Sequence, residues 1–313
     1  MKLIVPNYYP QFRCIADKCR HSCCIGWEID IDPVTREKFR CVPGEFGQRL
    51  NAAIDDSGEA SCFRLGPNER CPMLNKSGLC DLITELGEGA LCQICADHPR
   101  FRNFFGDRTE IGLGLCCEEA ARLILTQQEP MRLIELEDDG GQEKLDDVQT
   151  AVLNMRGLLI AIMQDRRASV TERLQRLLNT TQTSLPLRTI TEWADIYRGL
   201  ERLDPAWDAA LDSLRESPDA PLPEGLETAF EQFAVYLLYR HYPGLLEDGD
   251  SEGRVKFTVL SVTMLMCLCA AHAARHGSCT LEDCCEYARM YSAEIEYSED
   301  NIAALLDALW EEE

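Results

Sequence analysis

The sequence predicts a mainly α protein in which an irregular, cysteine-rich, metal-binding N-terminal domain packs on an acidic helical domain. The distribution of cysteine and of charge supports this division. Twelve of the 17 cysteines fall within the first 117 residues. Residues 1–120 carry 14 basic and 18 acidic side chains, whereas the rest of the chain carries 17 and 36. We therefore expect domains at 1–125 and 126–313, with a sub-boundary near 216–224, where prolines cluster.

The N-terminal segment is rich in turn signals and poor in long apolar periodic stretches. Pro43-Gly44 and Ser77-Gly78 are typical turn dipeptides. Residues 27–32 alternate apolar and acidic side chains, which predicts a half-buried strand with solvated carboxylates. A segment with so little apolar periodicity cannot bury a large core, so we expect metal bonds to replace part of it.

The remainder of the chain has the periodicity of helices. Glu118 and Glu119 open one helix, because acidic side chains favour its positive end. An uncharged run from Phe257 to Ala274 is nearly long enough to span a bilayer, but it contains Ser, Thr and His and ends in Arg275-His276. We interpret it as a buried core helix. Further helices are expected near 144–165, 170–179, 189–201, 204–215, 224–241, 253–275, 280–296 and 299–311.

Composition excludes several classes of function. The chain has 31 Lys and Arg against 54 Asp and Glu, a net charge of −23. Such acidity disfavours nucleic acids and anionic membranes as partners. The opening MKLIVPNYYPQF is too short an apolar run for a signal peptide. We expect a cytoplasmic protein, and in that reducing compartment many cysteines indicate metal binding rather than disulfides.

Four cysteine blocks lie close enough in sequence for several sulfurs to converge on a metal. Thiolates suit zinc or an iron–sulfur cluster. Only Cys92-x2-Cys95 has the spacing of a zinc ribbon, and the other gaps are irregular, so the spacing leaves both metals open. The remaining blocks are Cys14-x4-Cys19-x3-Cys23-Cys24, Cys71 with Cys80, and Cys116-Cys117.

These blocks resemble the flagellin lysine-N-methylases of the FliB type, within a wider cysteine-cluster group of zinc- or iron-chelating proteins. The resemblance covers about residues 12–125 and includes FRC-x4-CRHSCC-x-GW, CPML, HPR and GLGLCCEEAARLIL. It implies a protein lysine N-methyltransferase in which cysteines hold a [4Fe–4S] cluster and S-adenosylmethionine methylates lysines of flagellin or another protein. The matching cysteines are Cys14, Cys19, Cys23, Cys24, Cys71, Cys80, Cys95 and Cys116, and further matching positions are Trp27, Pro99 and Arg100.

The chain departs from the family pattern at two positions. Cys117 stands where the family has proline, and His98 stands where it has an aromatic residue before Pro-Arg. Eight matching thiols exceed the four that one cubane requires. Some must therefore be structural, bind a second metal or pair with each other. Cys41, Cys62 and Cys92 have no family counterpart.

The residues themselves do not identify a methyl-donor site. Gly112-Leu113-Gly114 is an isolated fragment rather than a dinucleotide-type loop. Deprotonation of a lysine ammonium needs a nearby base. The candidates near the cysteine blocks are Tyr8, Tyr9, His21 and His98, each of which could equally serve only in packing or on the surface. Arg100 and Arg102 could pair with a ligand carboxylate, support the cluster or form structural salt bridges.

Two alternatives remain open from the sequence. The chain could be a non-catalytic zinc- or iron-chelating protein, or a structural zinc domain on a helical adaptor. A distal set of five cysteines and two histidines could form a second metal site, although cysteines on an apolar helix commonly act as small hydrophobic residues. That set comprises Cys267, Cys269, His272, His276, Cys279, Cys284 and Cys285.

Overall fold

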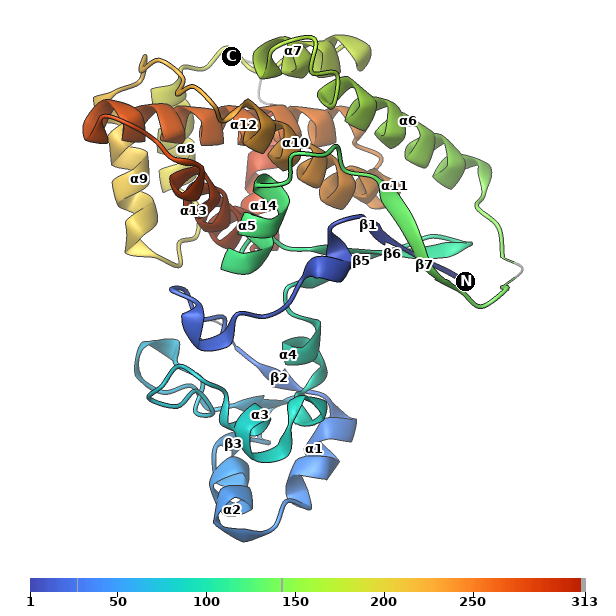
Figure 1. The fold of residues 1–313 in the computed structure, drawn as a ribbon, viewed down its shortest axis with the longest axis vertical. Helices are drawn as coiled ribbons and strands as arrows, with labels where there is room; N and C mark the ends of the chain where they lie inside the picture. The colour runs from blue at the N-terminus through green and yellow to red at the C-terminus, as the bar shows by residue number, and fades with distance from the viewer. Residues whose placement is uncertain (27, 142, 311–313) are drawn as a thin grey trace. The chain divides into compact units, whose positions relative to one another are not determined.

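The computed structural model describes residues 1–26, 28–141 and 143–310. The chain forms two compact units (Figure 1). Unit 1 comprises Met1–Phe12 and Phe101–Glu313, and unit 2 comprises Arg13–Arg100. Residues 101–125, which composition assigned to the N-terminal domain, are part of unit 1 in this division.

The helices expected from periodicity are present in unit 1. Four of them begin at a capping box. There the side chain of the capping residue accepts a hydrogen bond from the backbone N–H of the third helical residue, and the side chain of that residue accepts one from the backbone N–H of the cap. The capping residues are Asp146, Ser169, Thr189 and Thr280. The helices are α5 (Glu118–Leu125), α6 (Asp147–Met163), α7 (Val170–Thr180), α8 (Ile190–Arg198), α9 (Pro205–Glu216), α10 (Glu227–His241), α11 (Leu245–Asp248), α12 (Ser251–His276), α13 (Leu281–Tyr291) and α14 (Glu299–Ala308).

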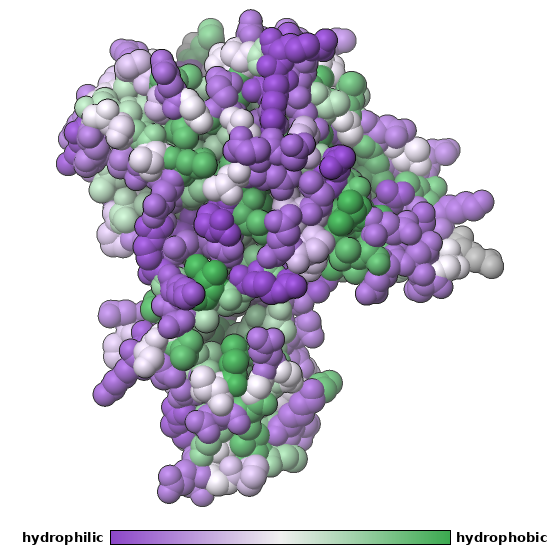
Figure 2. All heavy atoms as spheres, in the orientation of Figure 1, coloured by the Kyte–Doolittle hydropathy of each residue, from purple (hydrophilic) through white to green (hydrophobic). Residues whose placement is uncertain are grey.

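Helix α12 is the apolar run that the sequence analysis placed in the core. Among the described residues it is the one helix long and apolar enough to cross a membrane, but most of its central window is buried within unit 1. It packs beside α10, whose residues from Ala229 to Tyr239 are also buried. The expectation of a buried core helix is confirmed. Hydrophilic side chains cover most of the face of this unit shown in Figure 2.

Unit 1 also contains a four-stranded sheet that the sequence analysis did not predict. Its order is β5-β6-β1-β7, with β1 parallel to β6 and antiparallel to β7. The expectation of a mainly α protein is therefore correct for the helical part but incomplete. The strands escaped prediction because they come from separate parts of the chain and their exposed positions mix charged side chains with apolar ones such as Phe104 and Leu133. They are β1 (Lys2–Pro6), β5 (Arg100–Phe104), β6 (Arg108–Leu113) and β7 (Leu133–Asp138).

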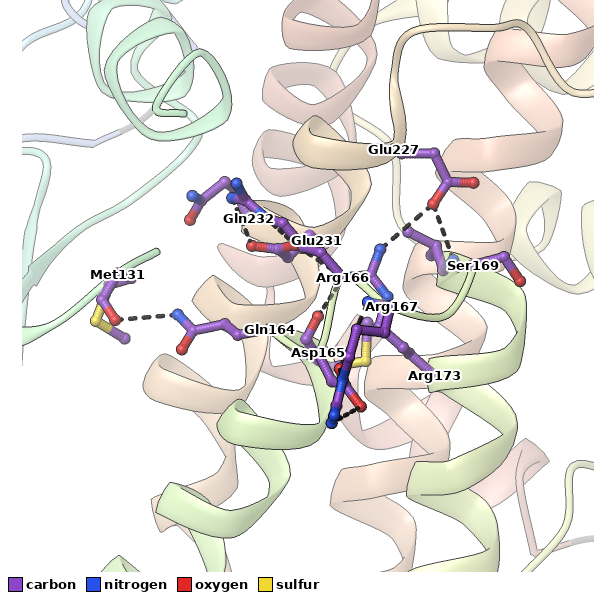
Figure 3. Close-up of polar contacts among 12 residues, drawn as sticks. Met131, Gln164, Asp165, Arg166, Arg167, Ser169, Arg173, Glu227, Glu231 and Gln232 are labelled. Carbon is purple, nitrogen blue, oxygen red and sulfur yellow. Dashed lines mark hydrogen bonds and ion pairs between the residues drawn. The ribbon is translucent and has the colours of Figure 1, made fainter. Parts of the chain in front are cut away.

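A buried ion network fixes the α6–α7 turn to α10 (Figure 3). The fully buried Glu231 carboxylate accepts two hydrogen bonds from Arg166, both 2.9 Å long, and one of 2.7 Å from Arg173. Arg173 also reaches Glu227 at 3.3 Å. Each charge in the network is paired, as burial requires, so we interpret the network as structural.

Unit 2 is built from short elements around a small core. A three-stranded antiparallel sheet has the order β2-β4-β3. The strand expected over 27–32 is present only as its last part, and residue 27 lies outside the described residues. The elements are α1 (Pro33–Arg40), α2 (Gly44–Ala52), α3 (Asp81–Leu86), α4 (Gln93–Asp97), β2 (Asp30–Ile31), β3 (Ile54–Asp55) and β4 (Ser61–Phe63).

Candidate functional site

Five thiols gather in the core of unit 2, and we call them the thiol core: Cys24, Cys71, Cys80, Cys92 and Cys95. Cys71 and Cys92 are buried members of the hydrophobic cluster, and the other three pack against it half-buried. The cluster also contains Met73 and Leu74 from the CPML motif. Thiols from three of the four sequence blocks therefore meet in one core.

Backbone pairing brings three of these thiols together. The N–H of Cys71 donates to the carbonyl of Cys24 at 2.8 Å, and the neighbouring Ile25 and Arg70 form an isolated bridge. The chain then turns at Asn75, whose side-chain oxygen accepts the N–H groups of Ser77 at 2.9 Å and Leu79 at 3.1 Å. This Asx-type turn returns Cys80 to pair with Leu74.

Cys95 in α4 and Cys92, the residue before α4, are the other two thiols, and Asp32 holds that helix. One Asp32 oxygen accepts the N–H of Thr35 at 2.9 Å and caps α1, while the other accepts the N–H of Gln93 at 3.0 Å. Asp32 thus joins the starts of two helices, a role beyond the solvated strand face expected for it. Cys92 and Cys95 lie one helical turn apart, with 3.3 Å between their sulfurs.

Electrostatics favour ionisation of some of these thiols and not others. A hydrogen bond from Cys23, assisted by Arg70, lowers the pKa of Cys24 to about 7. A hydrogen bond from Cys95 lowers the pKa of Cys92, and the same contact raises that of Cys95. Burial raises the pKa of Cys71 to about 12, and neighbouring Cys24 and Cys80 add to the effect. Mutual repulsion of this kind is relieved by a bound cation.

The other cysteines matched by the family pattern lie outside the thiol core. Cys14 is exposed, and its sulfur accepts the N–H of Ala16 at 3.4 Å. Cys19 is half-buried, and Cys23 is exposed beside Cys24. Cys116 belongs to unit 1 and hydrogen-bonds with Tyr297. The structure therefore brings together Cys24, Cys71, Cys80 and Cys95 of the eight, and adds Cys92, which has no family counterpart.

The remaining candidates lie in varied surroundings. Tyr8 is buried in the core of unit 1, whereas His21 is exposed in unit 2. Burial lowers the pKa of His98 to about 4. Arg100 donates to the carbonyl of Ala96 at 3.2 Å. Of the rest, Tyr9 is half-buried, Pro99 is buried, Arg102 and Cys41 are exposed, Cys62 and Cys117 are half-buried, and Trp27 lies outside the described residues.

Among the described residues, no three His, Cys, Asp or Glu side chains are grouped so that they could hold a single metal ion. The distal cysteines are instead part of the apolar core of unit 1, where Cys269 hydrogen-bonds with Cys279 and Cys284. His272 bonds the Tyr287 hydroxyl at 3.0 Å.

A second polar site, in unit 1, was missed by the sequence analysis. It surrounds Arg240 at the end of α10, and we call it the Arg240 site. The Arg240 guanidinium lies over two aromatic rings, 5.0 Å from the centroid of Phe101 and 4.8 Å from that of Tyr297. Its Nη1 donates to the Tyr236 hydroxyl at 2.7 Å, and that hydroxyl donates to Glu296 at 2.9 Å.

Two glycines make room for the rings of the Arg240 site. A Cβ atom at Gly112 would lie 2.2 Å from the Phe101 ring. A Cβ atom at Gly114 would lie 2.2 Å from the Tyr297 hydroxyl and 3.2 Å from Nη1 of Arg240. The Gly112-Leu113-Gly114 fragment thus has a physical role here, and it is the signal by which the sequence could have indicated this site.

Glu296 is the buried acidic residue of the Arg240 site. It ends a π-helical turn, η6 (Ser292–Glu296), a geometry that is frequent at functional sites. Its side chain is fully buried, and its Oε2 is 2.5 Å from Nε2 of His241. Burial opposes ionisation of Glu296, but Arg240 and His241 outweigh it and lower the pKa of the carboxyl. The carboxylate therefore stays ionised beside Arg240.

Comparison with known proteins relates the chain to lysine N-methylases. Residues 182–313 match the family described as the FliB lysine N-methylase C-terminal domain. The resemblance to FliB-type proteins is thereby confirmed, and on a part of the chain separate from the cysteine motifs that first indicated it. Three elements of the Arg240 site, namely α10, η6 and Tyr297, lie within the matched range.

Individual relatives are distant and only partly covered. Lysine-N-methylases of Salmonella typhimurium and Salmonella choleraesuis are 28% identical over 138 residues, which is 42% of this chain. The match spans 34% of the length of each relative, about one third. The flagellar biosynthetic protein FliU of Salmonella muenchen is 26% identical over 141 residues, 41% of this chain and 79% of that protein. No solved structure matches the chain.

Proposed function

We propose that this protein is a protein lysine N-methyltransferase that transfers the methyl group of S-adenosylmethionine to lysines of flagellin, or of a similar protein, in the cytoplasm. The match to the FliB lysine N-methylase C-terminal domain and the similarity to Salmonella lysine-N-methylases support the reaction. The similarity to the flagellar biosynthetic protein FliU supports a flagellar substrate. The structural observation that carries the proposal is the thiol core of unit 2.

The thiol core fits an iron–sulfur cluster in the chemistry of its donors. A [4Fe–4S] cluster takes one thiolate on each of four irons, so its ligands stand farther apart than four ligands on one ion. Cys24, Cys71, Cys80 and Cys95 would hold it. Cys92 lies beside Cys95 as a fifth thiol of the core. Such a cluster, when bound, joins separate chain segments and can transfer single electrons. The position of these four thiols in one small core supports a shared cluster.

A methyl-transfer assay tests the proposed reaction. The full chain, purified without oxygen, is incubated with flagellin and S-adenosylmethionine, and flagellin lysines are mapped by mass spectrometry. We expect mass increments of 14 Da per methyl group on lysine side chains, together with formation of S-adenosylhomocysteine. Unmodified lysines after incubation of protein with a filled thiol core would contradict the proposal.

The second candidate is a non-catalytic zinc- or iron-chelating protein. The gathering of five thiols in a small core supports it as well. Metal bound at the thiol core together with no methylation of flagellin would favour this candidate. Zinc rather than iron in the purified chain would point to a structural site.

A further inference from the structure

Arg240 is paired differently from the other buried arginines of the chain. Arg156 contacts Glu110 at 2.7 Å, and Arg173 contacts Glu231 at 2.7 Å. Among the described residues, Arg240 donates one hydrogen bond, to the Tyr236 phenol, and lies 3.5 Å from Glu296. A buried guanidinium normally takes a bidentate carboxylate, so Arg240 retains donor capacity that its neighbours do not use.

The rings of Phe101 and Tyr297 lie close to this guanidinium, with centroids 5.0 and 4.8 Å from its central carbon. The Arg240 side chain is 12% exposed and Tyr297 is 45% exposed, so both residues border solvent. The two rings also stabilise the cation when a ligand excludes water.

The surrounding groups hold the Arg240 guanidinium in one orientation. Tyr236 accepts from Nη1, and its own hydroxyl is fixed by Glu296 and by the N–H of Leu115 at 3.3 Å. One Glu296 oxygen, Oε1, is buried without a hydrogen-bond partner among the described residues. The Glu296 carboxylate is fully buried and bonds Tyr236 and His241, so Arg240 is the charged group of this pair that an anionic ligand can contact.

We propose that Arg240 binds the α-carboxylate of an amino-acid-type ligand, and that in this protein the ligand is the methionine portion of the methyl donor. The second part rests on the proposed function, which supplies the donor. An acidic side chain of the protein substrate has the same carboxylate chemistry and is the alternative source. Glu296 acts as a positioning residue, since it reaches Arg240 through Tyr236.

Calorimetry with two ligands tests the proposal on the full chain. The probes are S-adenosylmethionine and its decarboxylated analogue, which keeps the sulfonium, the amine and the adenosyl group. We expect the wild type to bind the analogue about tenfold to hundredfold more weakly, the usual effect of losing a charged hydrogen-bonded pair. This comparison needs no substitution, so it does not depend on whether a variant folds.

Two substitutions locate the effect. Arg240→Lys keeps the charge but loses the planar fork, and we expect it to weaken S-adenosylmethionine about tenfold while leaving the analogue unchanged. Arg215→Lys is the control, because Arg215 pairs with Asp195 on the surface of α9. Equal binding of both ligands by the wild type, or an Arg240→Lys effect of the same size on both, would overturn the assignment.

The outcomes separate this inference from the proposed function. A wild type that binds neither ligand overturns both the donor assignment and the proposed use of S-adenosylmethionine. A wild type that binds both alike, and methylates flagellin, overturns only the carboxylate site. An Arg240→Lys variant that raises the KM for flagellin alone overturns the assignment to the donor and indicates an acidic side chain of the substrate.

Discussion

Two groups of cysteines lie in the two units of this molecule, and their surroundings differ. The thiol core of unit 2 occupies a small core built from short strands and helices. The distal group, Cys269, Cys279 and Cys284, lies in the extensive apolar core of unit 1, between α12 and α13. In unit 1 helix packing supplies stability and the thiols serve as small apolar side chains. In unit 2 apolar burial is limited, so we expect stability to depend on a bound metal group.

Removal of the metal group is expected to produce the largest difference in stability between unit 2 and unit 1. Treatment of the full chain with a strong chelator should raise amide exchange across residues 13–100 by about a hundredfold or more, because metal binding energy contributes to folding. Exchange in α10 and α12 should stay unchanged. Hydrogen-exchange mass spectrometry reports both units in one experiment. Equal exchange before and after chelation would show that unit 2 folds without metal.

Disruption of the buried ion network should destabilise unit 1 and leave unit 2 unaffected. Glu231→Gln leaves Arg166 and Arg173 without their shared counter-charge and should destabilise unit 1 by about 3–5 kcal/mol. The metal content of unit 2 should not change. Chemical denaturation followed by far-UV circular dichroism measures the loss, with the exposed Glu216→Gln as control. A change below about 1 kcal/mol would mean that the network is not structural.

Acid should destabilise unit 2 through His98. Its pKa is about 4 in the native state, because of burial, against about 6.5 in an unfolded chain. Between these values the unfolded chain holds the extra proton, so stability falls as the pH drops from about 6.5 to about 4, by about 3 kcal/mol at most. Amide exchange of residues 13–100 at pH 7 and pH 5 measures this, and His98→Gln should remove the dependence. His21→Gln, at an exposed histidine of the same unit, should retain it.

A polar substitution in the distal group should have the smallest effect. Cys269→Ser buries a hydroxyl among apolar side chains and should cost about 1–3 kcal/mol of the stability of unit 1. The metal content should remain that of the wild type, since these thiols act in packing. Loss of bound metal in this variant would show that the distal cysteines also contribute to metal binding.

The sequence predicted the helical part well and the sheets poorly. Strong periodicity and caps such as Ser169 and Thr280 mark the helices, and each expected helix is present. Strands β1 and β7 come from distant parts of the chain, and their pairing is a non-local contact that no local pattern reveals. Period-two alternation over 27–32 predicted a longer strand than the two-residue β2. Asp32, the residue after β2, caps α1 instead of continuing the strand.

The sequence predicted that cysteines form the candidate site, but not which cysteines belong to it. Cysteine spacing indicated convergence, yet it could not show that Cys24 lies in the thiol core while its neighbour Cys23 is exposed. Cys92 joins because it precedes α4, which Asp32 holds from a distant segment. The Arg240 site depends on contacts between segments more than 100 residues apart, such as Phe101 and Arg240. Only its two glycines could have indicated it from the sequence.

Iron and acid-labile sulfide in the anaerobically purified chain show whether the thiol core holds an iron–sulfur cluster. We expect about four of each per chain, with a broad absorption band at about 400 nm, as for a cysteine-held cubane. Cys24→Ser and Cys95→Ser should lower both contents at least by about half, whereas Cys41→Ser, at an exposed cysteine of the same unit, should leave them unchanged. A colourless wild type that contains zinc, or iron that is unaffected by Cys24→Ser and Cys95→Ser, would contradict the assignment of the thiol core.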